Sequence, residues 1–212
     1  MSALTQFLAR RHGGMACCYE HFTAALEHAG LAAIRAELAG ALRGRIVEIG
    51  CGTGLNFRHY ARGARVAAVE PLADFYRFAA GRADGGPAEI AVIAADAQAL
   101  PFADATFDGA LATLVWCSVP DAVRGLAELR RVLKPGAPLC CFEHVRSEHP
   151  ALGLAQDLLN PLWRHFMDGC NLNRASLTAI RAAGFRIADV RAHALRGAGV
   201  PPLPMREIRA RA

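Results

Sequence analysis

Short apolar runs alternate with amphipathic stretches along most of the chain. Between residues 15 and 42, apolar side chains recur at helical spacing and predict one or two helices. Later apolar runs predict strands at residues 45–50, 65–70, 90–96, 107–115, 138–145, 185–194 and, by a weaker pattern, 205–212. The segments between them predict helices that open at residue 56 and that span residues 72–83, 122–137, 151–166 and 174–183.

This alternation of strands and helices predicts the fold class. It is typical of parallel β-α-β units, and their right-handed crossovers build an open sheet with helices on both faces. We therefore expect an α/β, Rossmann-like fold in one domain over residues 1–212. Residues 1–43 are expected to form an N-terminal helical cap or lid, residues 44–145 a cofactor-binding core, and residues 146–212 the acceptor side. Ligands of such sheets bind at the carboxyl ends of the strands.

Composition narrows the classes of protein that fit this pattern. The chain has 212 residues, 53% of them apolar and 20% charged, as in soluble globular proteins. No apolar run reaches the ~18 residues that span a bilayer, and the N-terminus lacks a signal-peptide pattern, so we expect a cytoplasmic protein without stable membrane insertion. The net charge is +5, but the arginines are scattered, which argues against a nucleic-acid partner.

Cysteine usage points to free thiols. The seven cysteines, at residues 17, 18, 51, 117, 140, 141 and 170, are odd in number and form no CxxC pair. Their spacing predicts neither a disulfide framework nor a zinc site, so no metal is expected. In a reducing compartment most of them would pack as small apolar side chains.

The stretch "EIGCGTGLNF", residues 48–57, has glycines at 50, 52 and 54. Glycines at the end of a first strand let the backbone approach a ligand closely. A dinucleotide loop of the pattern G-x-G-x-x-G needs a third glycine where this chain has Leu55. A Walker loop would end in Gly-Lys-Ser/Thr, which is absent here. The loop therefore fits a nucleotide-like cofactor other than these two kinds.

Three acidic residues accompany the loop. Glu70 follows the second strand, where a carboxylate can accept both hydroxyls of a ribose, in NAD or in an adenosyl cofactor. Asp96 ends the third strand, where it can bond an adenine amino group. Glu48 lies in the first strand, from which it can reach a ligand ammonium through water or backbone. Each acid alone could be a helix cap or a solvated loop end, but their common order along the strand ends indicates one ligand site.

These residues resemble the class I S-adenosylmethionine-dependent methyltransferases, of the type 11 domain. Glu48-x-Gly50-x-Gly52-x-Gly54 matches their first motif, and Glu70, Asp96-Ala97, residues 100–111 and residues 129–137 match the later ones. The resemblance covers about residues 45–145. It implies a seven-stranded sheet with one antiparallel strand, S-adenosylmethionine as the methyl donor and S-adenosylhomocysteine as the product.

The same resemblance implies a donor site. Its glycines would flank the methionine part of the donor, Glu70 would hold the ribose, and Asp96 would hold the adenine. The full set of expected cofactor-binding residues is Tyr19, Glu48, Gly50, Cys51, Gly52, Gly54, Asn56, Glu70, Pro71, Asp96, Ala97, Leu114, Trp116 and Cys117.

Two later stretches, "FEHVRSEHP" and "FMDGCNLNR", bear on the acceptor. His144 ends a strand and could orient or deprotonate an acceptor, or could be a structural histidine bonded to a carbonyl. Asp168 and Gly169 fit a turn, and Asn173 fits a helix N-cap. After the fourth strand, "VWCSVPD" lacks the Asn/Asp-Pro-Pro-aromatic motif, which argues against methylation of nucleic-acid or protein amino groups.

A narrower resemblance joins "VEIGCGTGLNF", "WCSV", "EHV" and "DGCNL" to the methyltransferase-like 7 group. These are membrane-associated thiol S-methyltransferases of animals, with bacterial relatives that methylate small thiols. The likeness runs from about Tyr19 to residue 185. It departs at the apolar N-terminal anchor of the animal proteins, which has no counterpart here, and at a more charged tail.

This resemblance implies methyl transfer to a small-molecule thiol, in natural-product metabolism or thiol detoxification. A thiol has a pKa of about 8.5, so modest electrostatic help is enough to make it a nucleophile. We expect His144 and Asp168 beside the acceptor as catalytic residues, with Trp116 as an apolar wall and Tyr19 closing over the donor.

Other functions stay open at this point. The chain could methylate oxygen or carbon of a quinone-like or polyketide-like molecule, or bind the cofactor as a noncatalytic partner protein. A nicotinamide oxidoreductase is disfavoured by Leu55. Arsenic methylation would need Cys117, Cys141 and Cys170 to converge near the strand ends. A monomer or a weak homodimer is expected.

Overall fold

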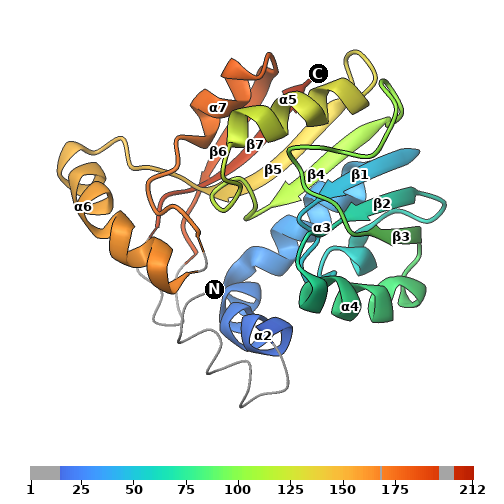
Figure 1. Cartoon of the computed structure of the whole chain (residues 1–212), viewed down its shortest axis with the longest axis horizontal. Helices are drawn as coiled ribbons and strands as arrows, with labels where there is room; N and C mark the ends of the chain where they lie inside the picture. Colours follow the sequence, from blue (N-terminus) through green and yellow to red (C-terminus); the bar gives the residue numbers. More distant parts are fainter. Residues whose placement is uncertain (1–14, 168, 196–202) are drawn as a thin grey trace.

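A computed structural model describes residues 15–167, 169–195 and 203–212 (Figure 1). Its centre is a seven-stranded sheet in the order β3-β2-β1-β4-β5-β7-β6. The strands are β1 (Arg45–Ile49), β2 (Arg65–Val69), β3 (Glu89–Ile93), β4 (Gly109–Thr113), β5 (Pro138–His144), β6 (Arg186–His193) and β7 (Met205–Arg211). The helices are α2 (Met15–Leu26), α3 (Ala32–Ala41), α4 (Ala73–Arg82), α5 (Ala122–Val132), α6 (Pro150–Phe166) and α7 (Ser176–Ala182).

The sheet confirms the Rossmann-like prediction. Neighbouring strands from β3 through β5 pair in parallel, whereas β7 pairs antiparallel with both β5 and β6. Every residue of β4 is buried, as expected for a central strand covered on both faces. The weak pattern at the end of the chain is β7, which lies between β5 and β6.

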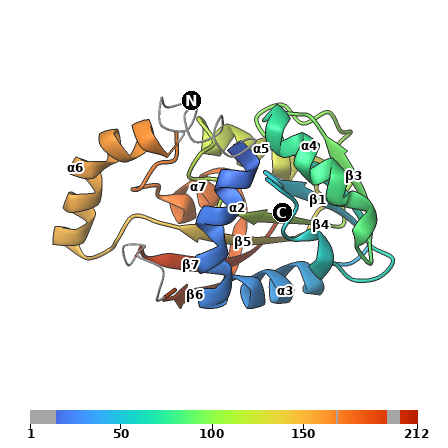
Figure 2. The same ribbon diagram turned by 90° about the horizontal axis from the view of Figure 1, so that it is seen from below.

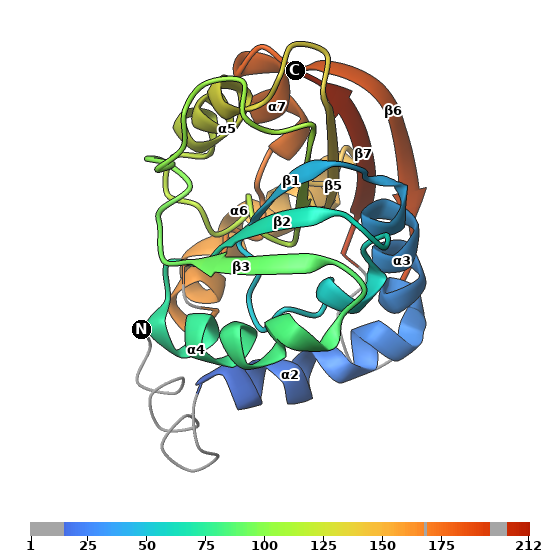
Figure 3. The same cartoon turned by 90° about the vertical axis from the view of Figure 1, so that its right-hand side faces the viewer.

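Helices cover both faces of the sheet (Figure 3). On one face, Leu126 and Leu129 of α5 and Ile180 of α7 pack against β4 and β5 in one apolar cluster. On the other face, Leu38 of α3 and Ala79 of α4 belong to a second cluster. The sheet therefore separates two apolar layers, and its carboxyl edge is left to the loops that follow β1, β2, β4 and β5.

The N-terminal segment forms two helices joined by a kink. A five-residue π-helical turn, Glu27–Leu31, links α2 to α3, and Gly30 within it has φ 118. Such a backbone angle is accessible to glycine at little cost, so Gly30 lets the chain change direction there. Seen from below, α2 crosses the molecule between α6 and α4 (Figure 2).

One predicted helix is wrong. The segment that opens at residue 56 forms only a 3₁₀ turn, Phe57–His59, before Tyr60 becomes extended. The glycines at 50, 52 and 54 all have positive φ, and a run this short cannot offset the cost of nucleating an α-helix. The loop after β1 is therefore built from backbone turns, not from the start of a long helix.

Two further properties complete the fold. Among the residues that the structure describes, no helix has the length and apolarity to cross a bilayer. Cys51, Cys117, Cys140, Cys141 and Cys170 are free thiols.

Candidate active site

The loop after β1 is anchored to the neighbouring strands. The N–H of Cys51 donates to the carbonyl of Val69 at the end of β2 (3.0 Å). Gly50 has φ 60, and a Cβ added there would lie 2.8 Å from a methyl carbon of Val115. Gly50 is thus required by both its backbone angle and its contact with the loop after β4. We call this loop, residues 48–57, the donor loop. The close contact places it against the segment that leads to Cys117.

Glu70 follows β2 and holds the glycine loop. Its carboxylate accepts hydrogen bonds from the backbone N–H of Gly52 (2.9 Å) and of Leu72 (3.0 Å). Burial raises the pKa of this carboxyl, although both hydrogen bonds act in the opposite direction. The carboxylate therefore already acts as an acceptor at the position expected for a ribose partner.

Glu48 is the centre of a buried polar network. Its carboxylate accepts from the amide of Asn56 (2.8 Å) and from the hydroxyl of Tyr60 (2.7 Å). The guanidinium of Arg35 donates to the Asn56 carbonyl oxygen (3.0 Å) and to Glu27 (2.8 Å). Burial raises the pKa of Glu48 to about 7. The direct partners of Glu48 are protein side chains, so it supports the loop from beneath.

Sequence reasoning missed Arg35. The residue lies in α3 between apolar positions, and its side chain is only 4% exposed. The sequence does contain a signal for it. A charged residue on the apolar face of a predicted helix indicates a buried polar contact, because arginine is seldom buried without a partner. Here its partners lie in the glycine-loop network.

The other expected donor residues occupy different settings. Asp96 lies three residues beyond the end of β3 and is exposed. Its carboxylate accepts a hydrogen bond from the backbone N–H of Gln98 (2.8 Å). Ala97 is buried in the core, and Pro71 is exposed. Leu114 has φ 61 and donates its N–H to the carbonyl of Phe142 (2.7 Å). Asp96 and Pro71 are therefore open to a ligand at the sheet edge.

Tyr19 of α2 lies over the donor loop. Its ring meets the edge of Phe75 at a centroid distance of 5.3 Å. A small cavity of about 10 Å³ is lined by Tyr19, Arg35, Gly50, Cys51, Gly52, Thr53, Leu55, Asn56 and Thr113. Such a volume holds about one water molecule. Helix α2 and the glycine loop therefore close on each other at this point.

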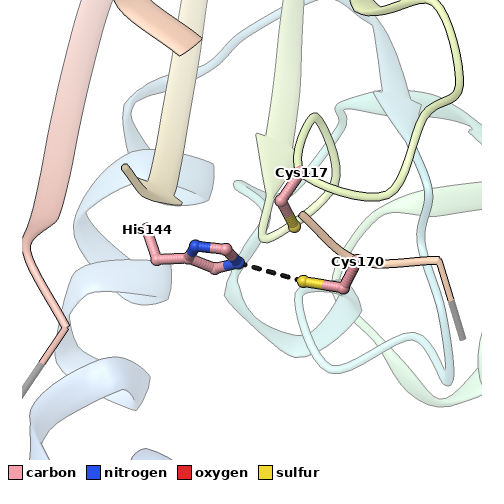
Figure 4. A group of neighbouring side chains, drawn as sticks. All are labelled: Cys117, His144 and Cys170. Carbon is pink, nitrogen blue, oxygen red and sulfur yellow. Dashed lines mark hydrogen bonds between the residues drawn. The ribbon is translucent and has the colours of Figure 1, made fainter. Parts of the chain in front are cut away.

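At the ends of β4 and β5, three side chains from distant segments converge (Figure 4). They are Cys117 from the loop after β4, His144 from the last position of β5, and Cys170 from the segment between α6 and α7. The two sulfurs and an imidazole nitrogen all lie within 4.8 Å of one another. The Nε2 of His144 is 3.1 Å from the sulfur of Cys170, and Trp163 donates to that sulfur (3.4 Å).

Electrostatics distinguish the two cysteines of this cluster. The hydrogen bond with Cys117 and the neighbouring imidazole of His144 lower the pKa of Cys170 to about 4. The same contact with Cys170, together with burial, raises the pKa of Cys117 well above its usual value. Burial alone would lower the pKa of His144, but its hydrogen bond to Cys170 raises it overall. The cluster therefore favours a thiolate on Cys170 beside a protonated imidazole.

Asn171 fastens the two cysteine segments together. Its backbone N–H and its side-chain amide both donate to the carbonyl of Cys117 (2.8 Å each). Arg174 donates to the carbonyl of Val119 in the same loop (2.7 Å). These bonds join residues 171–174 to the loop that carries Cys117 and Val119.

Several expectations for the acceptor side need correction. Trp116 is fully buried and packs against Gly125 of α5 in the core, so it lies beneath the site and does not form a wall of it. Cys141 is also fully buried in the core cluster, and His144 stands with Cys117 and Cys170 in its place. Asn173 is not the N-cap of α7, because its amide donates to Asp157 (2.9 Å) and Ala175 precedes the helix. Asp168 lies outside the described residues.

Glu143 is a functional candidate that sequence reasoning left aside. Its carboxylate accepts from the backbone N–H of Val115 (2.9 Å) and of Trp116 (3.2 Å), and burial raises its pKa to about 7. It therefore fixes the loop between β4 and Cys117 from the neighbouring strand.

Comparison with known proteins agrees with this geometry. Residues 47–141 match the model of the methyltransferase domain family. The human thiol S-methyltransferase TMT1A is 38% identical over 144 residues, which cover 66% of this chain and 59% of that protein. A demethylmenaquinone methyltransferase of Thermobifida fusca is 38% identical over 104 residues, 47% of this chain and 44% of that protein. The chain thus spans about 59% of the length of the thiol methyltransferase that it matches.

Solved structures agree on the fold. A SAM-dependent methyltransferase from Methanosarcina mazei superposes with a TM-score of 0.62 at 24% identity, covering 80% of this chain and 92% of that chain. At this identity the likeness concerns the fold, the seven-stranded and mostly parallel sheet. Residues 47–141 therefore match a methyltransferase domain, and the sheet has the fold of S-adenosylmethionine-dependent methyltransferases, which supports S-adenosylmethionine as the cofactor.

Proposed function

We propose that the protein transfers a methyl group from S-adenosylmethionine to the sulfur of a small-molecule thiol. The observation that carries this proposal is the contact of 3.1 Å between His144 and a sulfur atom at the end of β5. This contact lies next to the donor loop, through the packing of Gly50 on Val115. A site that holds one sulfur beside an imidazole can hold another. The similarity to thiol S-methyltransferases supports the same acceptor class.

The residues of the donor loop fit S-adenosylmethionine. At Gly52, an added Cβ would meet only a ring carbon of Phe75 at 3.9 Å, so the backbone is open to close approach by a ligand. In our proposal the glycines flank the methionine part, Glu70 accepts from the ribose hydroxyls and Asp96 accepts from the adenine amino group. Arg35 lines the small cavity beside Gly52, but its guanidinium is already paired with Glu27 and Asn56, so we assign it to support the loop.

The remaining donor-side residues take supporting roles in this proposal. Glu48 and Asn56 hold the loop through their buried hydrogen bond, and Tyr19 closes over the donor from α2. The others that we assign to the donor site are Cys51, Pro71, Ala97, Leu114, Trp116 and Cys117, with Trp116 contributing through its backbone and its packing, and Cys117 through its backbone alone.

The chemistry needs alignment more than strong base catalysis. Bound S-adenosylmethionine supplies an electrophilic methyl group on a sulfonium. The protein must hold the acceptor sulfur in line with that methyl at about 3 Å and keep water out. We assign His144 to hold the acceptor sulfur in its thiolate form, and we keep Asp168 as a second candidate for this role. In the transfer, the acceptor sulfur forms a bond to the methyl carbon while the bond from that carbon to the sulfonium breaks.

The proposal is tested by methyl transfer to a panel of small thiols, with matched alcohols and quinols as competing acceptors. We expect thioether products from the thiols. His144→Ala should lower the rate about a hundredfold, the usual size of a lost acid–base or positioning group. His165→Ala, a change at an exposed position of α6, is the matched control and should leave the rate unchanged. Methylation of oxygen or carbon with no thioether product would contradict the thiol assignment, and donor binding with no turnover would favour a noncatalytic role.

A further inference from the structure

The cluster of Cys117, His144 and Cys170 is larger than the proposed transfer requires. A single imidazole would be enough to hold an acceptor sulfur, and donor binding uses none of the three side-chain donor atoms. Core packing does not account for the cluster either, because Cys170 is only partly buried and two sulfurs and an imidazole nitrogen lie within 4.8 Å of one another. The residues come from three separate segments, and their side chains point toward one another (Figure 4).

The protein holds these three side chains in place through its backbone. Cys117 is fixed by two hydrogen bonds from Asn171, the residue that follows Cys170 (2.8 Å each). His144 is the last residue of β5, paired with Met205 of β7. The indole of Trp163 donates to the Cys170 sulfur (3.4 Å). Each of the three residues is therefore held by hydrogen bonds or by strand pairing.

We propose that Cys117, His144 and Cys170 bind one zinc ion. In a tetrahedral site, Zn–S bonds of about 2.3 Å and Zn–N bonds of about 2.0 Å separate neighbouring donor atoms by roughly 3.5–3.8 Å. The three donor atoms here lie within 4.8 Å of one another, with 3.1 Å between the imidazole nitrogen and the Cys170 sulfur. Small side-chain rotations are enough to reach the tetrahedral distances.

The donor set selects the kind of metal. Two thiolates and one imidazole suit zinc, whereas magnesium and calcium require oxygen ligands. Two thiolates also neutralise the charge of a divalent ion, so no net charge is buried at the end of the sheet. The cysteine spacing in the sequence predicts no such site, because these ligands are not neighbours along the chain and converge only in the fold.

Three protein ligands leave the fourth position of a tetrahedral ion open, as in catalytic zinc sites. If the proposed thiol transfer is correct, this position takes the acceptor, and His144 then acts on the acceptor sulfur through the metal. The acceptor S–H loses its proton to solvent as its sulfur binds the metal, since zinc ligands must be deprotonated. That sulfur then forms the bond to the methyl carbon, and the carbon–sulfonium bond breaks. The product is a neutral thioether, which binds zinc weakly and leaves.

The metal itself gives the first test, independent of any acceptor. The full-length protein, purified after growth with zinc, should carry about one zinc per chain by elemental analysis. Titration of the metal-free protein with Co²⁺ should give thiolate-to-cobalt charge-transfer absorption. Cys117→Ser and Cys170→Ser should weaken metal binding at least tenfold, since even outer-sphere changes cost 10–100-fold. Cys140→Ser is the matched control, a buried cysteine outside the cluster, and should bind metal like the parent.

Binding of S-adenosylhomocysteine to each variant checks that the fold and the donor site are intact. Absence of zinc and cobalt from the parent protein, or equal metal binding by the parent and both cluster variants, would overturn the proposal. A metal-loaded protein that methylates no thiol would refute the proposed function and leave the metal site standing. Full thiol methylation by the metal-free protein would refute the role of the metal in the transfer.

Discussion

The donor side and the acceptor side of this site are built in different ways. The donor side is a local structure, in which one loop of ten residues folds on itself and on the acid that follows the next strand. The acceptor side is assembled from three segments, with Cys117, His144 and Cys170 brought together by the ends of β4 and β5 and by the stretch before α7. A contiguous motif therefore identifies the donor, whereas the acceptor chemistry depends on tertiary convergence.

The difference also appears in the chemistry of the two sides. Around the donor loop the groups are oxygen and nitrogen donors in a closed hydrogen-bond network centred on Glu48. On the acceptor side the groups are two sulfurs and an imidazole. The first set suits the hydroxyl, amino and carboxylate groups of S-adenosylmethionine. The second suits a soft nucleophile or a soft metal.

The contact between the donor loop and the loop after β4 can be tested by adding a side chain at Gly50. Gly50→Ala should have the largest effect, because a Cβ there lies 2.8 Å from Val115 and φ is 60. We expect a loss of about 4 kcal/mol in the free energy of unfolding, from the backbone angle and overpacking together. Gly63→Ala is the control, since φ there is 81 but a Cβ would meet nothing within 4 Å. Gly63→Ala should lower the free energy of unfolding, measured by urea denaturation, by only about 1 kcal/mol. Equal losses in the two variants would contradict the steric argument.

The buried carboxylate beneath the donor loop should make stability depend on pH. Burial raises the pKa of Glu48 from 4.5 to about 7, so the folded chain keeps a proton that the unfolded chain has lost between these values. Stability should therefore fall as pH rises through this window. Glutamine cannot ionise, so Glu48→Gln should not lose this stability. Its free energy of unfolding relative to the parent should rise by up to about 3 kcal/mol between pH 5 and pH 8.

Urea denaturation at the two pH values measures this difference. Glu89→Gln is the control, because that side chain is 79% exposed at the start of β3, and it should show no such gain. A Glu48→Gln variant whose stability keeps the pH dependence of the parent would show that Glu48 is not the group responsible.

Glu70→Ala tests whether the donor side works independently of the acceptor side. The substitution removes the acceptor of two backbone N–H groups and, in our proposal, of the ribose hydroxyls. We expect the affinity for S-adenosylhomocysteine to fall about 30-fold, or about 2 kcal/mol, by isothermal titration calorimetry. Metal content should not change. An affinity within twofold of the parent would remove Glu70 from the ribose site.

The sequence predicted most of the fold, because strand and helix patterns are local. All seven strands were predicted, including β7, whose pattern is weak. The predicted helix at residue 56 was wrong because local helical propensity is outweighed by two features. Three glycines before it have left-handed backbone angles, and the hydroxyl of Tyr60 donates a hydrogen bond to Glu48. The burial of Trp116 could not be predicted, because strand periodicity does not say which residues beyond a strand end turn back into the core.

In the candidate site, too, the residues of local motifs were predicted, and those brought together by the tertiary structure were not. The glycines and Glu70 were predicted as a ligand site from their places along the chain, and their roles toward the donor stay predictions. The convergence of Cys117 and Cys170 was only one weak alternative, and its third member was taken to be Cys141 in place of His144. Cys141 and His144 lie in the same strand, three positions apart, so they cannot both reach the cluster at its end. Which one does depends on where β5 stops.

Asn171 gives the finest test of how the acceptor side is assembled. Its side-chain amide donates to the carbonyl of Cys117, while the side-chain amide of Asn173, two residues on, donates to Asp157 away from the cluster. Asn171→Ala should lower the rate of thiol methylation about tenfold, since displacements below 1 Å at a reacting group have effects of this order. Asn173→Ala should leave it unchanged. Affinity for S-adenosylhomocysteine should stay the same in both, because neither asparagine contacts the donor loop. If both variants lose activity equally, the segment acts only as general support, and the cluster does not depend on the bond from Asn171 to Cys117.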